Sequence, residues 1–67
     1  MENVRLASNQ KLLKAFEVAE ILNISKSMAY RLIQQGQIPP IRIGRSVRVS
    51  MESLTTFIEQ NTSSNPD

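Results

Sequence analysis

The fold is decided by residues 15–49, which read AFEVAEILNISKSMAYRLIQQGQIPPIRIGRSVRV. The beginning of this stretch predicts a helix over 15–22, because its apolar residues fall on one arc at about one hundred degrees per residue. That arc contains Ala15, Val18, Ala19, Ile21 and Leu22, with Glu17 and Glu20 opposite. Phe16 lies off the arc, where it could cover the edge of the core. Lys14 occupies the N-cap position and is a poor cap, so we expect this end of the helix to fray.

A short turn and a second helix follow. Asn23 tolerates the left-handed conformation that often ends a helix, Ile24 can fill the corner, and Ser25 can cap the next helix. The pattern predicts that this helix spans 26–35 and ends at Gly36, before Pro39 and Pro40. Its apolar half contains Met28, Ala29, Leu32 and Ile33. Its outer half contains donor groups and no carboxylate: Lys26, Ser27, Tyr30, Arg31, Gln34 and Gln35.

Residues 41–49 are predicted to form a β-hairpin around Gly44. A two-residue loop, Gly44-Arg45, would place Arg42 opposite Val47 and Ile41 opposite Arg48, mixing polar and apolar side chains on each face. A three-residue loop would instead pair Ile43 with Val47 and Ile41 with Val49. We favour the second register, because it buries all four β-branched residues. It also aligns Arg42 with Arg48, and such a like-charged pair suggests a bridging anion.

The remaining chain predicts one further helix and little else. Ser50 is a good N-cap for a helix over 51–60, in which Met51, Leu54, Phe57 and Ile58 form the buried stripe. Residues 11–13 could add a short extended segment. We therefore predict an α+β fold, a small winged helix-turn-helix over 11–60, with a flexible N-terminal arm over 1–10 and a disordered tail over 61–67.

Composition excludes several kinds of chemistry. The 67 residues allow one domain and include no Cys and no His, which excludes thiol chemistry, disulfides, imidazole catalysis and the usual zinc sites. Glu17 and Glu20 fit a solvated helix face better than an acid/base pair. We expect no enzyme activity and no cofactor. No run approaches the roughly eighteen apolar residues of a membrane span, so we expect a soluble, cytoplasmic protein without a membrane partner.

The distribution of charge is the main clue to function. From Ile21 to Met51 there is no acidic residue but there are five basic ones, although the whole chain carries a net charge of only +2. Clustered cations of this kind suit a nucleic-acid phosphate backbone, because binding releases the counterions condensed on it. Those five cations are Lys26, Arg31, Arg42, Arg45 and Arg48.

Three segments together resemble the excisionase family of MerR-like winged-helix DNA-binding domains. They read FEVAEILNISKSMAYRLI (16–33), GQIP (36–39) and RIGRSVRV (42–49), and the resemblance covers about 13–58. It implies that the second helix enters the major groove and that the hairpin acts on the backbone or in the minor groove. The implied DNA-binding residues are Ser27, Tyr30, Arg31 and Gln34 on the helix and Arg42, Arg45 and Arg48 on the hairpin. Lys14 departs from the Thr or Ser frequent in the family, and Asn23 from the frequent Gly.

Two functional hypotheses follow from different classes. The first is a double-stranded DNA binder, either an architectural accessory factor in excision or a small transcriptional regulator. Useful specificity would then require several copies on adjacent sites, and an integrase or recombinase could be a further partner. The second is a protein-interaction module that recruits a recombinase through the third helix and the acidic tail, with binding that survives high salt.

Overall fold

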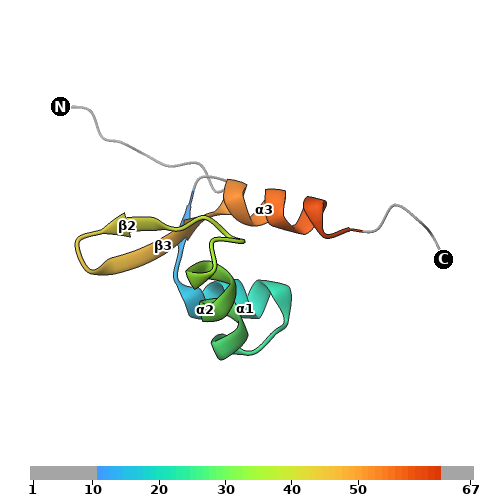
Figure 1. The fold of residues 1–67 in the computed structure, drawn as a ribbon, viewed down its shortest axis with the longest axis horizontal. Helices are drawn as coiled ribbons and strands as arrows, with labels where there is room; N and C mark the ends of the chain where they lie inside the picture. Colours follow the sequence, from blue (N-terminus) through green and yellow to red (C-terminus); the bar gives the residue numbers. More distant parts are fainter. Residues whose placement is uncertain (1–10, 63–67) are drawn as a thin grey trace.

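The computed structural model describes residues 11–62, and Figure 1 shows the arrangement of its helices and strands. The expected arm over 1–10 and residues 63–67 of the expected tail lie outside the described residues. The elements follow in the order β1 (Leu12–Leu13), α1 (Ala15–Leu22), α2 (Lys26–Gln34), β2 (Ile41–Ile43), β3 (Ser46–Ser50) and α3 (Met51–Gln60). No helix within 11–62 is long and apolar enough to cross a membrane.

The ends of α1 are closed by local hydrogen bonds. At its start the Glu17 carboxylate accepts a hydrogen bond from the Lys14 backbone N–H at 2.8 Å, so this end is held by Glu17 and not by the Lys14 side chain. At its end Asn23 is left-handed, with φ 59°. The N–H of Ile24 then reaches the Ala19 carbonyl at 3.0 Å, and that of Asn23 reaches Glu20. This is the Schellman pattern, which satisfies two terminal carbonyls and confirms the predicted role of Asn23.

Both ends of α2 are also closed by local hydrogen bonds. Ser25 Oγ accepts from the Met28 N–H at 3.0 Å, which confirms the predicted cap. Gly36 is left-handed, with φ 79°, and the N–H of Gln37 donates to the Leu32 carbonyl at 3.0 Å. The helix ends at Gln34, one residue before the predicted end, and Gln35 serves as its C-cap. The tight turn at Asn23 sets α1 against α2 as a helix-turn-helix (Figure 1).

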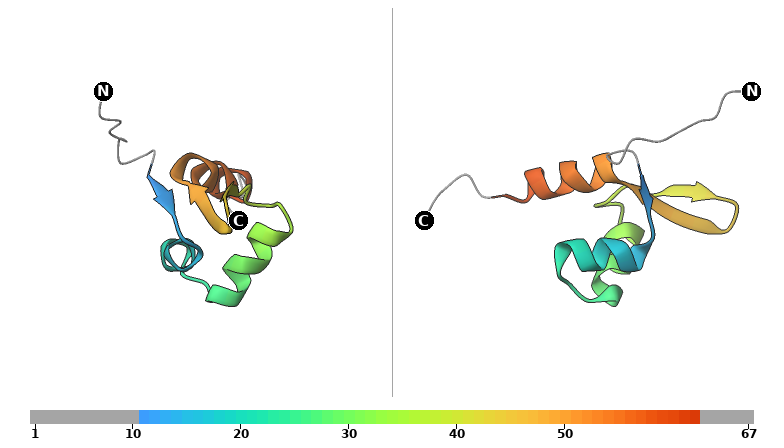
Figure 2. Two further views of the ribbon diagram at one scale, coloured as in Figure 1. Left: turned by 90° about the vertical axis from the view of Figure 1, so that its left-hand side faces the viewer. Right: turned by 180° about the vertical axis from the view of Figure 1, so that it is seen from behind.

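Three antiparallel strands form a sheet in the order β1-β3-β2. The short extended segment predicted at 11–13 is confirmed as β1, which pairs only with the end of β3 through Leu12↔Ser50 and Leu13↔Val49. The rest of β3 pairs with β2, and this hairpin projects beyond the helices as a wing (Figures 1 and 2). The chain is therefore an α+β winged helix-turn-helix, as predicted.

The predicted hairpin register is wrong by one residue. The observed pairs are Ile41↔Arg48, Arg42↔Val47 and Ile43↔Ser46, which require the two-residue loop Gly44-Arg45. In that loop Gly44 alone has a positive φ, 60°. A positive φ restricted to the first loop residue is the pattern of a type II′ turn, whose twist matches the flanking strands. Turn geometry therefore outweighs the burial of all four β-branched side chains.

The corrected register separates Arg42 from Arg48. Directly paired residues share a face of the sheet and successive residues alternate, so Arg42 lies on the face of Val47, and Arg48 on the face of Ile41. The two arginines are not opposite each other, and the expected bridging anion has no such pair to bind. Ile41 and Ile43 are exposed instead of buried.

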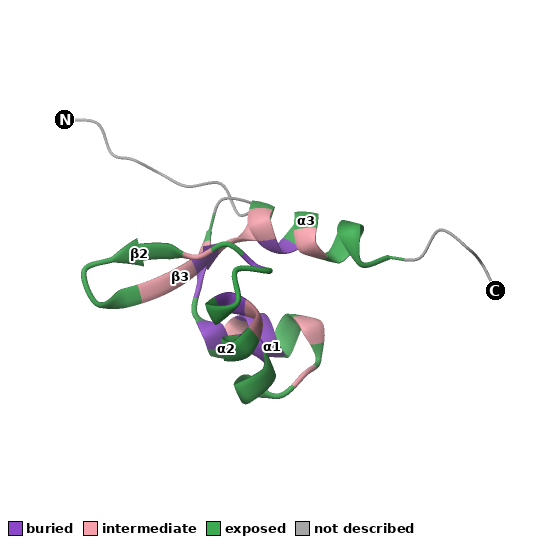
Figure 3. Cartoon of the chain, in the orientation of Figure 1, coloured by how far each residue is buried: buried purple, intermediate pink, exposed green. Residues whose placement is uncertain are grey.

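The core lies where both helices of the helix-turn-helix meet β1, β3 and α3. Its fully buried large side chains are Val18, Ile38, Val49 and Leu54. Figure 3 shows that the buried residues lie where these elements face one another. Leu13 and Ile38 join this core although no helical period marks them. Besides Ile41 and Ile43, three side chains on the helices that were expected to be buried are exposed, namely Ile21, Met28 and Ile58. They flank the buried stripes, because a domain this small covers only the middle of each apolar face.

Helix α3 follows the wing and packs against β3. Its predicted bounds and cap are confirmed, since it spans Met51–Gln60 and Ser50 Oγ accepts from the Ser53 N–H at 3.0 Å. Leu54 is its fully buried residue, while Met51 and Phe57 pack at the edge of the core. Beyond the helix, the Asn61 side-chain amide donates to the Phe57 carbonyl at 2.8 Å. This arrangement leaves the outer face of α2 and the wing uncovered by α3 (Figure 1).

Candidate nucleic-acid interface

The outer face of α2 presents a polar stripe. Ser27, Tyr30, Arg31 and Gln34 are all exposed, at positions i, i+3, i+4 and i+7 of one helix. Tyr30 keeps 52% of its surface accessible, so its ring can reach a ligand. The stripe combines hydroxyl, phenol, guanidinium and amide groups, which can donate to base edges and to phosphate oxygens.

The wing carries its three arginines in three different settings. Arg45 is the second residue of the loop and lies at the wing tip. Arg42 is exposed on edge strand β2. Arg48 is half-buried, and its guanidinium Nη1 donates to the Val47 carbonyl at 3.0 Å. The fold therefore fixes Arg48 more firmly than the other two arginines of the wing.

A cleft of about 330 Å³ separates the wing from the starts of α1 and α2. It exists because β1 pairs only with the end of β3, so the edge of β3 at 46–48 has no β1 residue beside it. We call this space the basic cleft, because four of its lining residues are cations and none is a carboxylate. The cations are Lys14, Lys26, Arg45 and Arg48, and the aromatic side chains of Phe16 and Tyr30 complete the lining together with Ala15, Ser46 and Val47.

The structure brings together half of the DNA-binding residues expected from the sequence. Lys26, Tyr30, Arg45 and Arg48 line the basic cleft, whereas the other four do not. Of those four, Ser27, Arg31 and Gln34 continue along the exposed face of α2, and Arg42 lies on the edge strand β2.

Sequence reasoning missed Lys14 and Phe16 as members of this surface. The sequence pattern marks Lys14 only as a poor cap and Phe16 only as a cover for the core edge. Phe16 is in fact 45% exposed and lines the basic cleft. The available signal was that both residues break the pattern of α1, one at its cap and one off its apolar arc.

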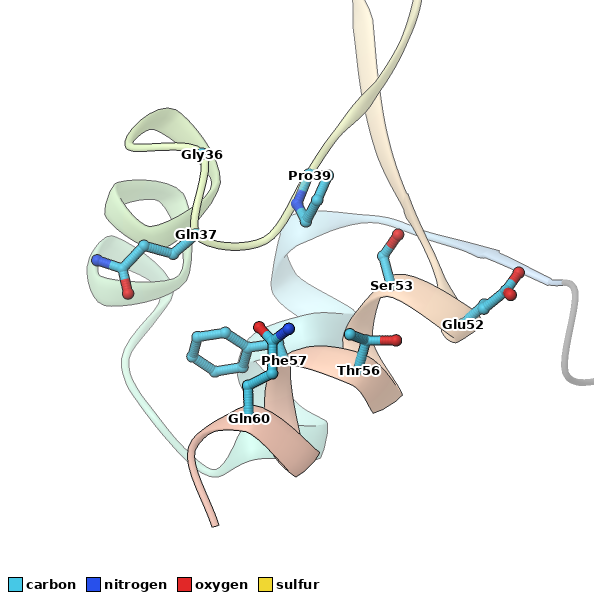
Figure 4. Close-up of a pocket in the computed structure, with 8 residues that line it drawn as sticks. All are labelled: Gly36, Gln37, Pro39, Glu52, Ser53, Thr56, Phe57 and Gln60. Carbon is cyan, nitrogen blue, oxygen red and sulfur yellow. The ribbon is translucent and has the colours of Figure 1, made fainter. Parts of the chain in front are cut away.

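A second groove lies on the other side of the molecule, between α3 and the segment that follows α2. It has a volume of about 380 Å³. Figure 4 shows Ser53 and Phe57 of α3 facing the segment from Gly36 to Pro39. Glu52 is the one charged residue among those that line it. The two faces of the domain thus differ in charge, because cations line one depression and a carboxylate lines the other.

The described residues contain no group of three or more His, Cys, Asp or Glu side chains placed to hold a metal ion. The functional groups that do gather within 11–62 are the cations and donors of α2, the wing and the start of α1.

Known proteins are similar to this chain over both α2 and the wing. The profile of a family described as "Helix-turn-helix domain" matches residues 12–62, which include α2 and the whole wing. A Mycobacterium tuberculosis protein named "Putative DNA-binding protein Rv0500A" is 39% identical over 49 residues, which are 73% of this chain and 63% of that protein. The "Putative antitoxin VapB50" of the same species is 36% identical over 64 residues, 96% of this chain and 48% of that protein.

This chain therefore spans between about half and two thirds of the length of these two relatives. A shorter match is to the "Uncharacterized protein YvgK" of Bacillus subtilis, which is 44% identical over 41 residues. The match covers 61% of this chain and 13% of that protein. No solved structure matches the chain significantly.

Proposed function

The chain belongs to the helix-turn-helix domain family, and from this premise we propose that α2 and the wing bind double-stranded DNA with a preference for sequence. The observation that carries the proposal is the continuity of the surface. The exposed stripe of α2 runs into the basic cleft at Lys26 and Tyr30, and the cleft continues to the wing tip at Arg45. Duplex DNA presents base edges and phosphates side by side, so it needs such a mixed surface.

In this proposal the two elements have different tasks. A helix fits the major groove of B-form DNA, where Arg can bind guanine and Gln can bind adenine in bidentate fashion. Arg31 and Gln34 are therefore the residues assigned to base edges. Arg42, Arg45 and Arg48 neutralise phosphates, and Arg45 at the tip can enter the minor groove. Lys26 and Ser27 at the start of α2 hold the helix on the backbone.

The biological role we propose is that of an accessory factor in DNA excision, with transcriptional regulation as the alternative. Support comes from the resemblance to excisionases over 13–58, since the winged domain alone carries the binding surface. One module of this size covers little DNA, so several copies on adjacent sites, or an integrase beside them, would supply the remaining specificity. The family supports a binding protein and not an enzyme.

The proposal is tested by selecting ligands from a pool of random duplexes with the full chain. We expect successive rounds to enrich one short motif, and footprinting should protect the same motif in the DNA that flanks the gene. Retention of duplexes without any enrichment would leave a DNA-binding module that does not read sequence. Failure to retain duplex DNA at low salt would contradict the proposal.

The α3 groove favours a second candidate function, the recruitment of a protein partner. Its walls are mostly polar, with Glu52 at one end and the apolar ring of Phe57 at the other (Figure 4). Because it lies apart from the basic cleft, a partner could bind there while DNA occupies α2 and the wing. Replacing Thr56, an exposed residue of this groove, by Arg should then abolish binding of a recombinase in a pull-down at high salt without changing affinity for duplex DNA.

A further inference from the structure

We propose that the start of α1 is part of the DNA-binding surface, and that one sugar-phosphate strand of the duplex lies in the basic cleft between Lys14 and the wing. The inference rests on the proposed function and adds an element to it. It assigns a phosphate to Lys14 and a sugar contact to Phe16, both of which line the cleft.

Two lysines lie where α1 and α2 begin at the basic cleft. Lys14 is the N-cap of α1, and Lys26 is the first residue of α2. The N-terminus of a helix bears partial positive charge, so a cation there is unfavourable and an anion is favourable. Two helices that begin at one cleft with a lysine each are thus arranged to receive an anion between them. A Ser or Thr at position 14 would cap α1 better, and the chain has a lysine instead.

Charges around Lys14 strengthen this argument. The carboxylate closest in sequence, Glu17, is engaged as the cap of α1, because it accepts the Lys14 backbone N–H at 2.8 Å. Across the cleft, Arg48 is held by its bond to the Val47 carbonyl. Four cations therefore face one space without a lining carboxylate, and their mutual repulsion is relieved when a phosphate enters.

The aromatic residues indicate which kind of anion fits. Phe16 and Tyr30 line the same cleft and keep 45% and 52% of their surfaces accessible. A free phosphate would gain nothing from these rings, whereas a deoxyribose beside its phosphate offers them an apolar face. The combination of cations and exposed rings therefore favours a nucleic-acid strand over an inorganic anion.

The experiment compares two lysines that differ in position and not in charge. Lys14→Ser removes the cation from the cleft and supplies a residue that can cap α1. Lys11→Ser removes a cation from an exposed position that does not line the cleft. Affinity for a labelled duplex is measured between about 0.1 and 0.3 M salt, where distant charges are largely screened.

We expect Lys14→Ser to weaken binding and to lower the magnitude of the salt slope by about 1, because one phosphate contact is lost. The ratio of wild-type affinity to Lys14→Ser affinity should therefore fall about threefold when the salt concentration rises threefold. Lys11→Ser should leave the slope unchanged, and Lys14→Arg should restore both slope and affinity. A urea midpoint for Lys14→Ser equal to or above that of the wild type would show that the loss comes from the interface.

The identity of the phosphate is tested on the DNA side. One methylphosphonate at the phosphate that Lys14 contacts should weaken wild-type binding and have no further effect on Lys14→Ser, because both changes remove the same interaction. Additive effects at every phosphate, with slopes equal for Lys14→Ser and Lys11→Ser, would overturn this inference while leaving DNA binding intact. A wild-type chain that does not bind duplex DNA would instead overturn the proposed function itself.

Discussion

Two residues with positive φ set the angles at which the chain leaves its helices. Asn23 ends α1 and Gly36 ends α2, and each allows two terminal carbonyls to be satisfied. Asparagine tolerates this conformation because its short polar side chain can bond locally, whereas other L-residues incur about 1–2 kcal/mol. The orientation of α2 against α1, and of the wing after α2, depends on these single positions.

Gly36→Ala isolates this backbone cost. A Cβ at position 36 would meet nothing within 4 Å, so no clash adds to the strain of φ 79°. We expect the free energy of unfolding to fall by about 1 kcal/mol, measured by urea denaturation. Gln35→Ala, at an exposed neighbour with ordinary right-handed φ of −80°, serves as the control and should change stability by less than about 0.5 kcal/mol. Equal effects of both changes would contradict the role given to Gly36.

Among the helices and strands, the sequence predicts features set within one segment, such as helix bounds. It does not predict the hairpin register, for which turn geometry competes with burial. The bounds of α1 and α3 are predicted correctly, since caps and apolar period lie within each segment. The hairpin register is not predicted correctly, because burial of Ile41 and Ile43 favours one register, whereas Gly44 at the first loop position favours the type II′ turn of the other. The members of the basic cleft contributed by α1 are also missed, because residues 14 and 48 meet only through the pairing of β1 with β3.

The division of labour between α2 and the wing predicts different consequences of mutation. Arg31→Ala and Gln34→Ala should cost about 1–3 kcal/mol more on the preferred duplex than on random DNA, because contacts to base edges discriminate. Arg42→Ala should weaken both duplexes equally, since a phosphate contact carries no sequence information. Fluorescence anisotropy on the two duplexes measures the difference. Equal losses for Arg31→Ala and Gln34→Ala on both DNAs would reassign these residues to the backbone.

On the scale of the whole molecule, one small core supports two faces of different charge. For a chain of 67 residues we expect a total stability of roughly 3–5 kcal/mol. Its fully buried large side chains, among them Val18 and Leu54, come from segments distant in sequence. The loss of one of them should therefore unfold the whole domain and remove DNA binding without touching the interface.

Leu54 and Ile58 of α3 form a matched pair of residues that tests whether the loss of one buried side chain unfolds the domain. Leu54 is fully buried, whereas Ile58 is 41% exposed although the helical period assigns both to the core. Leu54→Ala should cost about 2–5 kcal/mol, comparable to the whole stability, and give an unfolded circular dichroism spectrum at 25 °C. Ile58→Ala should remain folded, with a cost of about 1 kcal/mol or less. A folded Leu54→Ala variant would show that α3 is not required for the core.

If α2 and the wing bind duplex DNA largely through its phosphates, as we propose, the affinity must depend steeply on salt concentration. If about four to six phosphates are neutralised, log K should fall against log salt with a slope of roughly −3.5 to −5.5, at −0.9 per contact. The measurement is a titration of labelled duplex with the full chain at several salt concentrations. A slope in this range supports phosphate contacts by Lys26, Arg42, Arg45 and Arg48. A slope near zero would contradict this proposal and favour a protein-binding module.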